Sequence, residues 1–211
     1  MPLGLWLATN AVGLLAIPSG LWAVAVWRAD QRWKRINAAF ERVASFDATP
    51  GTRNAMMILK SRSRPIPLFD ASAPLKDRYC RVSWGDAKRA LIPTQFNRDT
   101  TAKTNALRDC FEDMMNRMTQ IEMAITSGRL SEADVCHIVE PWVHRLNRWV
   151  EDDGLTRNFR IYLWFEHKVA VRRLFRRFGD GMQVRQKEWL AFCAEYDVDP
   201  HCLIAAGLTE I

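Results

Sequence analysis

The chain has 211 residues, of which 48% are hydrophobic and 26% are charged, and its formal net charge at pH 7 is +6. This charged fraction is ordinary for a globular domain and excludes wholesale disorder, and the length allows one well-buried core besides a membrane segment. The basic balance favours anionic partners, such as lipid headgroups, nucleic acid or an acidic protein face, without choosing among them.

The first predicted element is a transmembrane anchor over residues 1–27, with its helix at Leu3–Trp27. No side chain before Arg28 is ionisable. A helix of this length spans about 36 Å, more than the ~30 Å hydrocarbon core of a bilayer. The sequence therefore predicts a single-pass membrane helix. Its tryptophans near the two ends are expected at the membrane interfaces, as in aromatic belts: Trp6, Trp22 and Trp27.

The charges that follow the anchor predict its orientation. A basic cluster comes directly after it, with only Asp30 opposing. Positively charged flanks stay in the cytoplasm, so we expect the N-terminus outside and the C-terminal domain cytoplasmic, at a bacterial inner membrane. The same cluster is a candidate contact for anionic lipid headgroups or for a partner: Arg28, Arg32, Lys34 and Arg35.

Two other interpretations of the N-terminal run remain open. Ala23-Val24-Ala25 resembles the cleavage site of a signal peptide, although the basic segment expected before such a run is missing. A buried core helix of a soluble protein is the other alternative. Beyond the membrane, Trp33, Ile36, Phe40 and Val43 keep helical spacing, which predicts a juxtamembrane helix extension over residues 28–46.

Residues 47–100 are predicted as a proline-containing connection with short helices. Thr52–Lys60 has the spacing of a short helix, whereas the three prolines of Ser61–Pro74 favour an extended connection without an element of its own. Ser83 is placed to cap a helix that runs to about Ile92, where Pro93 stops it.

Residues 101–211 are predicted to form a helical bundle. The strongest periodic signal lies in Thr101–Ser127, and Gly128 is well placed to end that helix. Acidic side chains along it are interpreted as a solvated face: Asp109, Glu112, Asp113 and Glu122. The apolar side chains alternate steps of four and three, which puts them on one stripe: Leu107, Phe111, Met114, Met118, Ile121 and Ile125.

Further helices follow in the bundle. Ser131 and Asp134 form a capping pair for the next helix, and Pro141 is expected in the first turn of another. One long helix is predicted over Thr156–Phe178, and a last pair over Gln183–Tyr196 and Pro200–Ala206. Because no stretch shows sustained two-residue alternation, the predicted fold class is all-α: one transmembrane helix plus a cytoplasmic helical bundle.

Metal and catalytic signatures are weak. The weak metal candidates are His137, Glu140 and His144, whose spacing would suit one helix face if Pro141 did not interrupt it. Cys193, His201 and Cys202 match no closed zinc pattern. The sequence contains no G-x-S-x-G, P-loop or G-x-G-x-x-G motif. We therefore expect no cofactor and no catalytic residue.

The five cysteines form no C-x-x-C pair, and Cys110 and Cys136 are expected to pack as small hydrophobic residues. This usage fits a reducing compartment. A second basic cluster consists of Arg172, Arg173, Arg176 and Arg177. It is interpreted as a complement to the helix dipole, as a lipid or partner contact, or as a nucleic-acid surface. Nucleic acid is not the expected partner, because the sequence contains no standard binding module.

Several short segments together carry a family resemblance that covers about Arg53–Gly179. They are Arg53–Leu59, Ala106–Asp113, Gly128–Glu132, Glu140–Trp142 and Leu174–Gly179. In these segments the chain is similar to an uncharacterised bacterial family with one N-terminal membrane helix followed by a helical domain of unknown function. The resemblance implies the anchor and the helical fold, and it supplies no activity and no catalytic residues.

The function expected from these observations is non-enzymatic. We expect an accessory or scaffolding subunit that binds a larger inner-membrane protein complex, with small anchor residues that let another transmembrane helix approach closely: Gly4, Ala8, Ala11 and Gly20. A membrane-tethered sensor or a stress or phage-defence effector is the alternative. A metal-dependent enzyme that uses His137, Glu140 and His144 is the third class.

Overall fold

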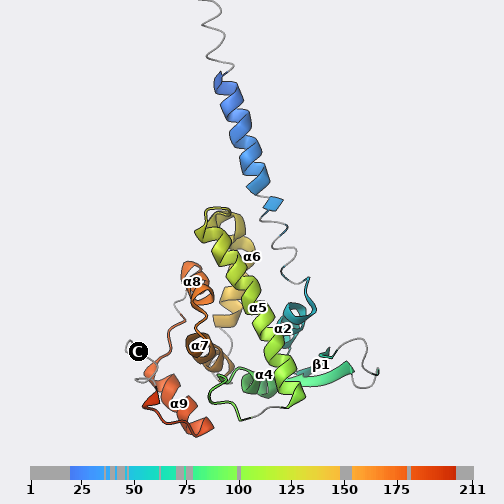
Figure 1. Cartoon of the computed structure of the whole chain (residues 1–211), viewed down its shortest axis with the longest axis vertical. Helices are drawn as coiled ribbons and strands as arrows, with labels where there is room; N and C mark the ends of the chain where they lie inside the picture. The colour runs from blue at the N-terminus through green and yellow to red at the C-terminus, as the bar shows by residue number, and fades with distance from the viewer. Residues whose placement is uncertain are drawn as a thin grey trace, which may run out of the picture.

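The computed structural model describes residues 20–35, 37–38, 41, 46, 48–61, 63–69, 74, 78–98, 101–147, 154–179 and 182–202. Residues 20–35 form a helix, here called the N-terminal helix, which stands beyond one end of a mostly helical domain (Figure 1). Within these described residues, no helix is both long and apolar enough to cross a bilayer. Most of the predicted anchor, including Trp6, lies in residues 1–19, outside the described part.

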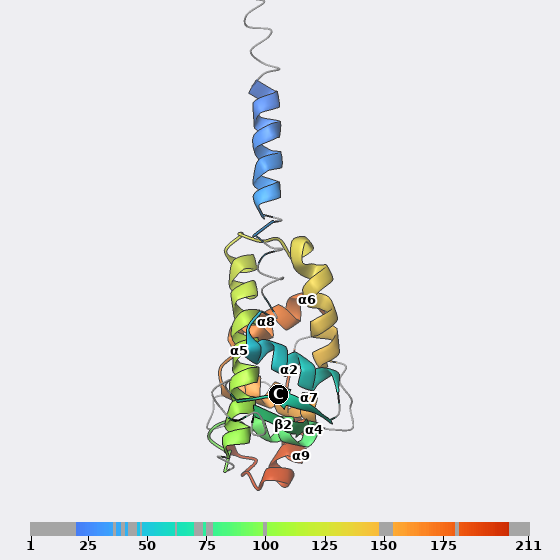
Figure 2. The same ribbon diagram turned by 90° about the vertical axis from the view of Figure 1, so that its right-hand side faces the viewer.

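The described part of the domain contains two helices and a strand pair before α5, and α6 to α9 after it. The first are α2 (Pro50–Lys60), β1 (Ser63–Pro67), β2 (Tyr79–Ser83) and α4 (Trp84–Ala90). Then come α5 (Ala102–Thr126), α6 (Glu132–Asn147), α7 (Leu155–Phe165), α8 (Val169–Arg177) and α9 (Gln186–Tyr196). The turn between α5 and α6 lies at the end of the domain that faces the N-terminal helix, and α9 lies at the opposite end (Figure 2).

Helix α5 is the long element against which α2, α4 and α8 pack. The apolar stripe that the sequence predicts for it is confirmed, because all six of its side chains are buried in the main core. The same core takes in α2, the strands and α4, through residues such as Ile58, Ile66, Val82 and Ala87. The region predicted as a connection is therefore part of the packed domain.

The local helix signals are also confirmed. Ser83 and Asp86 form a complete capping box at the start of α4, and Ser131 and Asp134 exchange hydrogen bonds before α6. Gly128 has a φ of 69° after α5. The left-handed backbone needed there suits glycine, which has no Cβ to clash.

The all-α prediction is wrong in one respect, because β1 and β2 pair as an antiparallel hairpin. Each strand has five residues and only one buried side chain, Ile66 in β1 and Val82 in β2. So short an alternation leaves no detectable sequence period. Pro65 and Pro67 remain compatible with pairing because they occupy alternate positions on a strand with one neighbour, where their missing amides can face away from it.

Helix α6 runs through Pro141 instead of ending before it, which corrects the two helices expected there. A proline inside a helix costs about 3 kcal/mol. The buried side chains Val135, Val139, Val143 and Leu146 continue on both sides of it. Fully burying each such side chain contributes about 1.5–3 kcal/mol, so the packing of the continuous stripe outweighs the lost hydrogen bond.

The long helix predicted over Thr156–Phe178 is instead divided into α7 and α8. His167 has a φ of 51°. Its amide donates to the Trp164 carbonyl and the Lys168 amide donates to the Leu163 carbonyl, the bond pattern of a Schellman ending. The sequence did not show this ending because histidine stands where glycine is usual.

A smaller apolar cluster joins α9 to α7. The Trp189 ring stacks on Phe165 and on Phe192, at centroid distances of 5.3 and 5.7 Å. The indole N–H of Trp189 donates to the Pro200 carbonyl at 2.9 Å. The start of the helix predicted at Pro200–Ala206 is thus tied to α9, while residues 203–206 fall outside the described part.

Candidate functional site

The N-terminal helix carries an exposed apolar face. Trp22, Val26 and Trp33 are 73%, 51% and 61% exposed. At about 100° per residue these three positions fall within roughly 40° of one another around the helix axis. Apolar side chains at consistent helical positions over three turns, without cover from the described residues, are typical of a surface that another molecule occupies.

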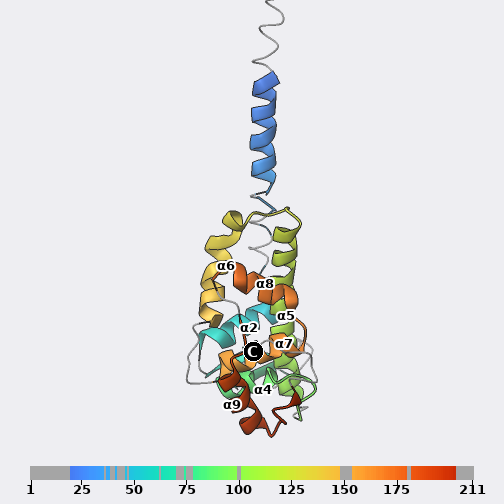
Figure 3. The same cartoon turned by 90° about the vertical axis from the view of Figure 1, so that its left-hand side faces the viewer.

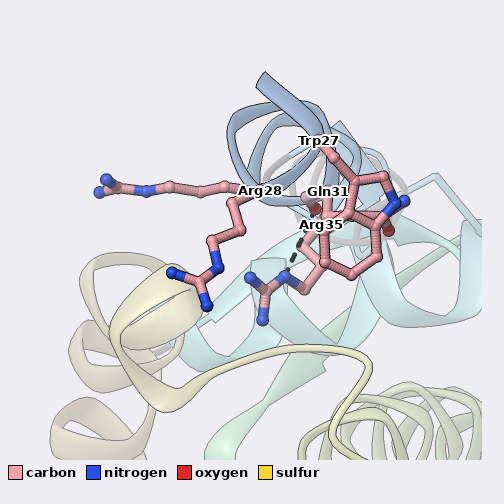
Figure 4. A pocket seen from close by; sticks show the side chains of 5 residues that line it. Trp27, Arg28, Gln31 and Arg35 are labelled. Atoms are coloured by element: carbon pink, nitrogen blue, oxygen red, sulfur yellow. Dashed lines mark hydrogen bonds between the residues drawn. The ribbon is translucent and has the colours of Figure 1, made fainter. Parts of the chain in front are cut away.

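A basic face lies on the other side of the same helix. Trp27, Arg28, Gln31, Arg32 and Arg35 line an open notch of about 550 Å³. Figure 4 shows the Trp27 ring on one side of this notch and arginine side chains on the other. The Arg35 Nε–H donates to the Gln31 carbonyl at 3.4 Å. The sequence-predicted cluster is thus brought together, with one exception.

The exception is Lys34, which is not among the residues that line the notch. Its ammonium group lies 2.7 Å from the Asp30 carboxylate, one turn earlier. The four basic residues that appeared equivalent in the sequence therefore divide into three notch arginines and one paired lysine.

Two of the notch arginines, Arg32 and Arg35, also affect the pKa of a carboxyl group in the domain. Asp134 in the first turn of α6 has a pKa below its ordinary value, because Ser131 donates hydrogen bonds to it and because Arg35 and Arg32 lie near enough to stabilise its charge. In Figure 3 the turn between α5 and α6 is the part of the domain next to the N-terminal helix. The basic face therefore lies on the side of the α6 N-terminus.

The second predicted basic cluster, on α8, does not act as one unit. The Arg172 guanidinium lies 3.8 Å from the centroid of the Trp164 ring, and burial together with Arg176 lowers its pKa. Arg173 and Arg176 are exposed. Arg177 instead binds two carboxylates, which gives it a structural role in joining α8 to α5 and α6.

Glu122 is one of those carboxylates, and its burial overturns the prediction of a solvated face at this position. It is 1% exposed and accepts hydrogen bonds from Arg177 Nε at 2.8 Å and from Thr126 at 3.0 Å. The other carboxylate is that of exposed Glu132. The sequence signal that could have found this network is an acidic residue directly beside the apolar stripe.

Glu112 and Asp113 also have specific partners rather than a solvated role. Glu112 accepts from the buried Tyr162 hydroxyl and from Lys168, both at 2.5 Å. Burial and this carboxylate raise the pKa of Tyr162, so its hydroxyl stays protonated. Asp113 accepts from the hydroxyl groups of Thr49 and Thr52 and caps α2 from the neighbouring helix α5.

The candidate metal residues show no coordination geometry. His144 Nε2 lies 3.2 Å from Glu140 Oε1, and both side chains are largely exposed. The side chain of His137 lies outside the described part. Among the described residues, no three His, Cys, Asp or Glu side chains gather as a metal site would require.

Comparisons with protein-family models, with curated proteins and with solved structures give no match. The surfaces of the described residues are therefore what indicates a function. Of these, the N-terminal helix is distinguished by exposed apolar side chains on several sides up to Trp27, Leu21 and Val24 included, by Trp33 on the side of Trp22, and by a basic face after Trp27.

Proposed function

We propose that this protein is a membrane-anchored, non-enzymatic subunit that binds a membrane-protein complex through its N-terminal helix and presents the helical domain on the cytoplasmic side. The observation that carries the proposal is the exposed apolar face of Trp22, Val26 and Trp33. Trp22 and Val26 belong to the uncharged N-terminal run, which is long enough to span a bilayer, and Trp33 extends the same side of the helix beyond it.

The bilayer accounts for only part of this face. With Trp27 at the membrane interface, Trp33 lies six residues further, or about 9 Å along the helix. Measured along the backbone, that distance exceeds the ~5–8 Å headgroup layer of one leaflet, and the rigid indole reaches back less far than an arginine side chain does. Because Trp33 is on the same side as Trp22, cover for both side chains is best supplied by a neighbouring helix that leaves the membrane beside this one.

The domain offers a second contact surface for the same partner. Arg173 and Arg176 are exposed on α8, Arg173 with its Nε 3.8 Å from Glu122 Oε1, and the nearby Val169 is 49% exposed. Basic residues around an exposed apolar side chain suit an acidic partner face, where complementary charge accelerates association.

Site-specific photocrosslinking tests the proposed helix interface. A photoreactive amino acid placed at Trp33 in the full chain in its native membrane is expected to crosslink to a transmembrane or juxtamembrane segment of one other protein. The matched control places it at Gln31, on the opposite face, where the yield to that segment is expected to drop at least tenfold. Equal yields from both positions would contradict a defined apolar interface.

The anchoring part has its own test. Alkaline carbonate extraction should leave the full chain in the membrane pellet, and protease added to sealed inverted vesicles should digest the domain. Release of the chain by carbonate, or a mature N-terminus that begins near Val26, would refute the anchor and favour a cleaved signal peptide.

A further inference from the structure

The notch on the N-terminal helix lies at a defined depth if the chain is anchored as proposed. Arg28, Arg32 and Arg35 follow Trp27 by about 1.5, 7.5 and 12 Å along the helix axis. The headgroup layer is ~5–8 Å thick, and an arginine side chain can bend back along the helix to bring its charged end to the interface. All three guanidinium groups can therefore reach the layer that contains lipid phosphates.

The composition of the notch suits a phosphate. A guanidinium group presents planar, paired donors that match phosphate oxygens, and it stays charged at every physiological pH. Within the described residues, none of the three notch arginines forms an ion pair, whereas Lys34 is bound to Asp30. The notch therefore concentrates positive charge. No carboxylate lines it, although Asp134 of α6 lies near enough to Arg32 and Arg35 for their charges to lower its pKa.

The size of the notch and its aromatic wall agree with a lipid. Its volume of about 550 Å³ is open to solvent, so the notch leaves room for a headgroup at the helix surface but does not enclose it as a small-molecule cleft of similar volume would. The Trp27 ring borders it on the side next to the predicted anchor. An indole at this level can pack against the glycerol and upper acyl region of a lipid whose phosphate faces the arginines.

We propose that the notch formed by Trp27, Arg28, Gln31, Arg32 and Arg35 is a binding site for the headgroup of one anionic phospholipid of the cytoplasmic leaflet. This inference rests on the proposed anchoring. It goes further by separating a lipid site from general attraction: the three arginines bind the headgroup, and Lys34 does not. Bound lipid would hold this part of the N-terminal helix at the level of the headgroups.

Native mass spectrometry of the full chain in mild detergent, titrated with phosphatidylglycerol, tests the site. The informative variants are Arg32→Gln and Arg35→Gln, alone and combined, and the matched control for each single change is Lys34→Gln, which removes one positive charge from the same helix. A basic residue near anionic lipid contributes about 1 kcal/mol, or about fivefold. We expect roughly 25-fold weaker binding for the double variant and less than twofold for the control.

Two further comparisons define the ligand. Phosphatidylcholine should bind at least tenfold more weakly than phosphatidylglycerol, because its net charge is zero. Glycerol 3-phosphate at millimolar concentration should not displace bound phosphatidylglycerol, because it lacks the acyl chains that contact Trp27. Displacement by glycerol 3-phosphate would show a site for free phosphate compounds and would overturn the assignment to lipid.

Equal weakening by Arg32→Gln, Arg35→Gln and Lys34→Gln as single changes would also overturn the proposal, because it would show diffuse attraction. Circular dichroism of each variant should retain the wild-type helix signal, since all these side chains are exposed. The titration is done on purified protein, so it is independent of carbonate extraction. Loss of anchoring and loss of the lipid site are therefore separate results.

Discussion

Asn158 provides the sharpest test of how α9 is held on the domain. Its side chain is fully buried, and its amide donates to the Lys88 carbonyl at 2.9 Å and to the Tyr196 hydroxyl at 3.0 Å. Its oxygen accepts from Arg157 Nε and Nη2 at 3.2 and 3.1 Å. One side chain thus joins α7 to α4 and α9.

The expected cost of Asn158→Ala follows from these bonds. Each intramolecular hydrogen bond contributes about 0.5–1.5 kcal/mol net, and a buried group left without its partner costs about 1–3 kcal/mol. Arg157 keeps its contact with Glu195, so the main losses fall on the Lys88 carbonyl and the Tyr196 hydroxyl. We expect the free energy of unfolding to fall by about 3 kcal/mol.

Tyr196→Phe is the matched smaller change. It removes one of the four bonds to Asn158 and is expected to cost about 1 kcal/mol. Burial raises the pKa of Tyr196 to about 12, so the hydroxyl is protonated and able to accept the amide N–H across the neutral range. In the Asn158→Ala background the same change should cost much less, because the hydroxyl has already lost its donor.

Urea unfolding of the full chain in detergent, followed by near-ultraviolet circular dichroism, measures all four species of this cycle. Stability changes should appear as shifts of the midpoint with an unchanged slope. The reasoning is refuted if Asn158→Ala costs less than about 1 kcal/mol, or if the two changes add within about 0.3–0.5 kcal/mol, as independent sites do.

Three further changes have expected outcomes. Gly51→Ala should lower the free energy of unfolding by about 1 kcal/mol, although alanine favours helices. The reason is that the added Cβ would lie 2.8 Å from Asp113 Oδ2. Stabilisation of the variant in a denaturant series would contradict this close approach of α2 to Asp113. Below about pH 4.5 the melting temperature should fall as Asp113 and Glu195 become protonated. Burial raises the pKa of both carboxyl groups, but hydrogen bonds outweigh it, from Thr49 and Thr52 to Asp113 and from Lys88 and Arg157 to Glu195, so both pKa values are lowered. The stabilisation from these two carboxylates is therefore complete above the unfolded pKa values of 3.8 and 4.5 and is lost as the pH falls through the folded values. Glu195→Gln should flatten that fall, and an unchanged profile would refute its share. Iodoacetamide should modify Cys110 at least tenfold more slowly in the folded chain than after unfolding, because burial raises the pKa of its thiol to about 11. Half-buried Cys136 serves as the control thiol. Equal modification rates of Cys110 and Cys136 in the folded chain, measured by mass spectrometry, would refute the protection of Cys110 by burial.

Much of the domain was predictable because its signals are local. The stripe on α5, the capping residue Ser83 and the capping pair of Ser131 and Asp134 depend on residues within a few turns of one another, and all are confirmed. The basic cluster after residue 27 was also predictable as a set. Its division into notch arginines and a paired Lys34 was not, because it depends on which way each side chain turns.

The sequence by itself determined the helical character of the domain, the ends of several helices and the uncharged N-terminal run followed by positive charge, since each depends on composition or spacing within one segment. Only the tertiary structure decided the pairing of β1 with β2, the passage of α6 through Pro141 and the division at His167. It also decided the burial of Glu122 against Arg177, 55 residues away in the chain. The physical reason is common to these cases: packing and ion pairing between distant segments outweigh local preferences of a few kcal/mol, and no local pattern records which segments will meet.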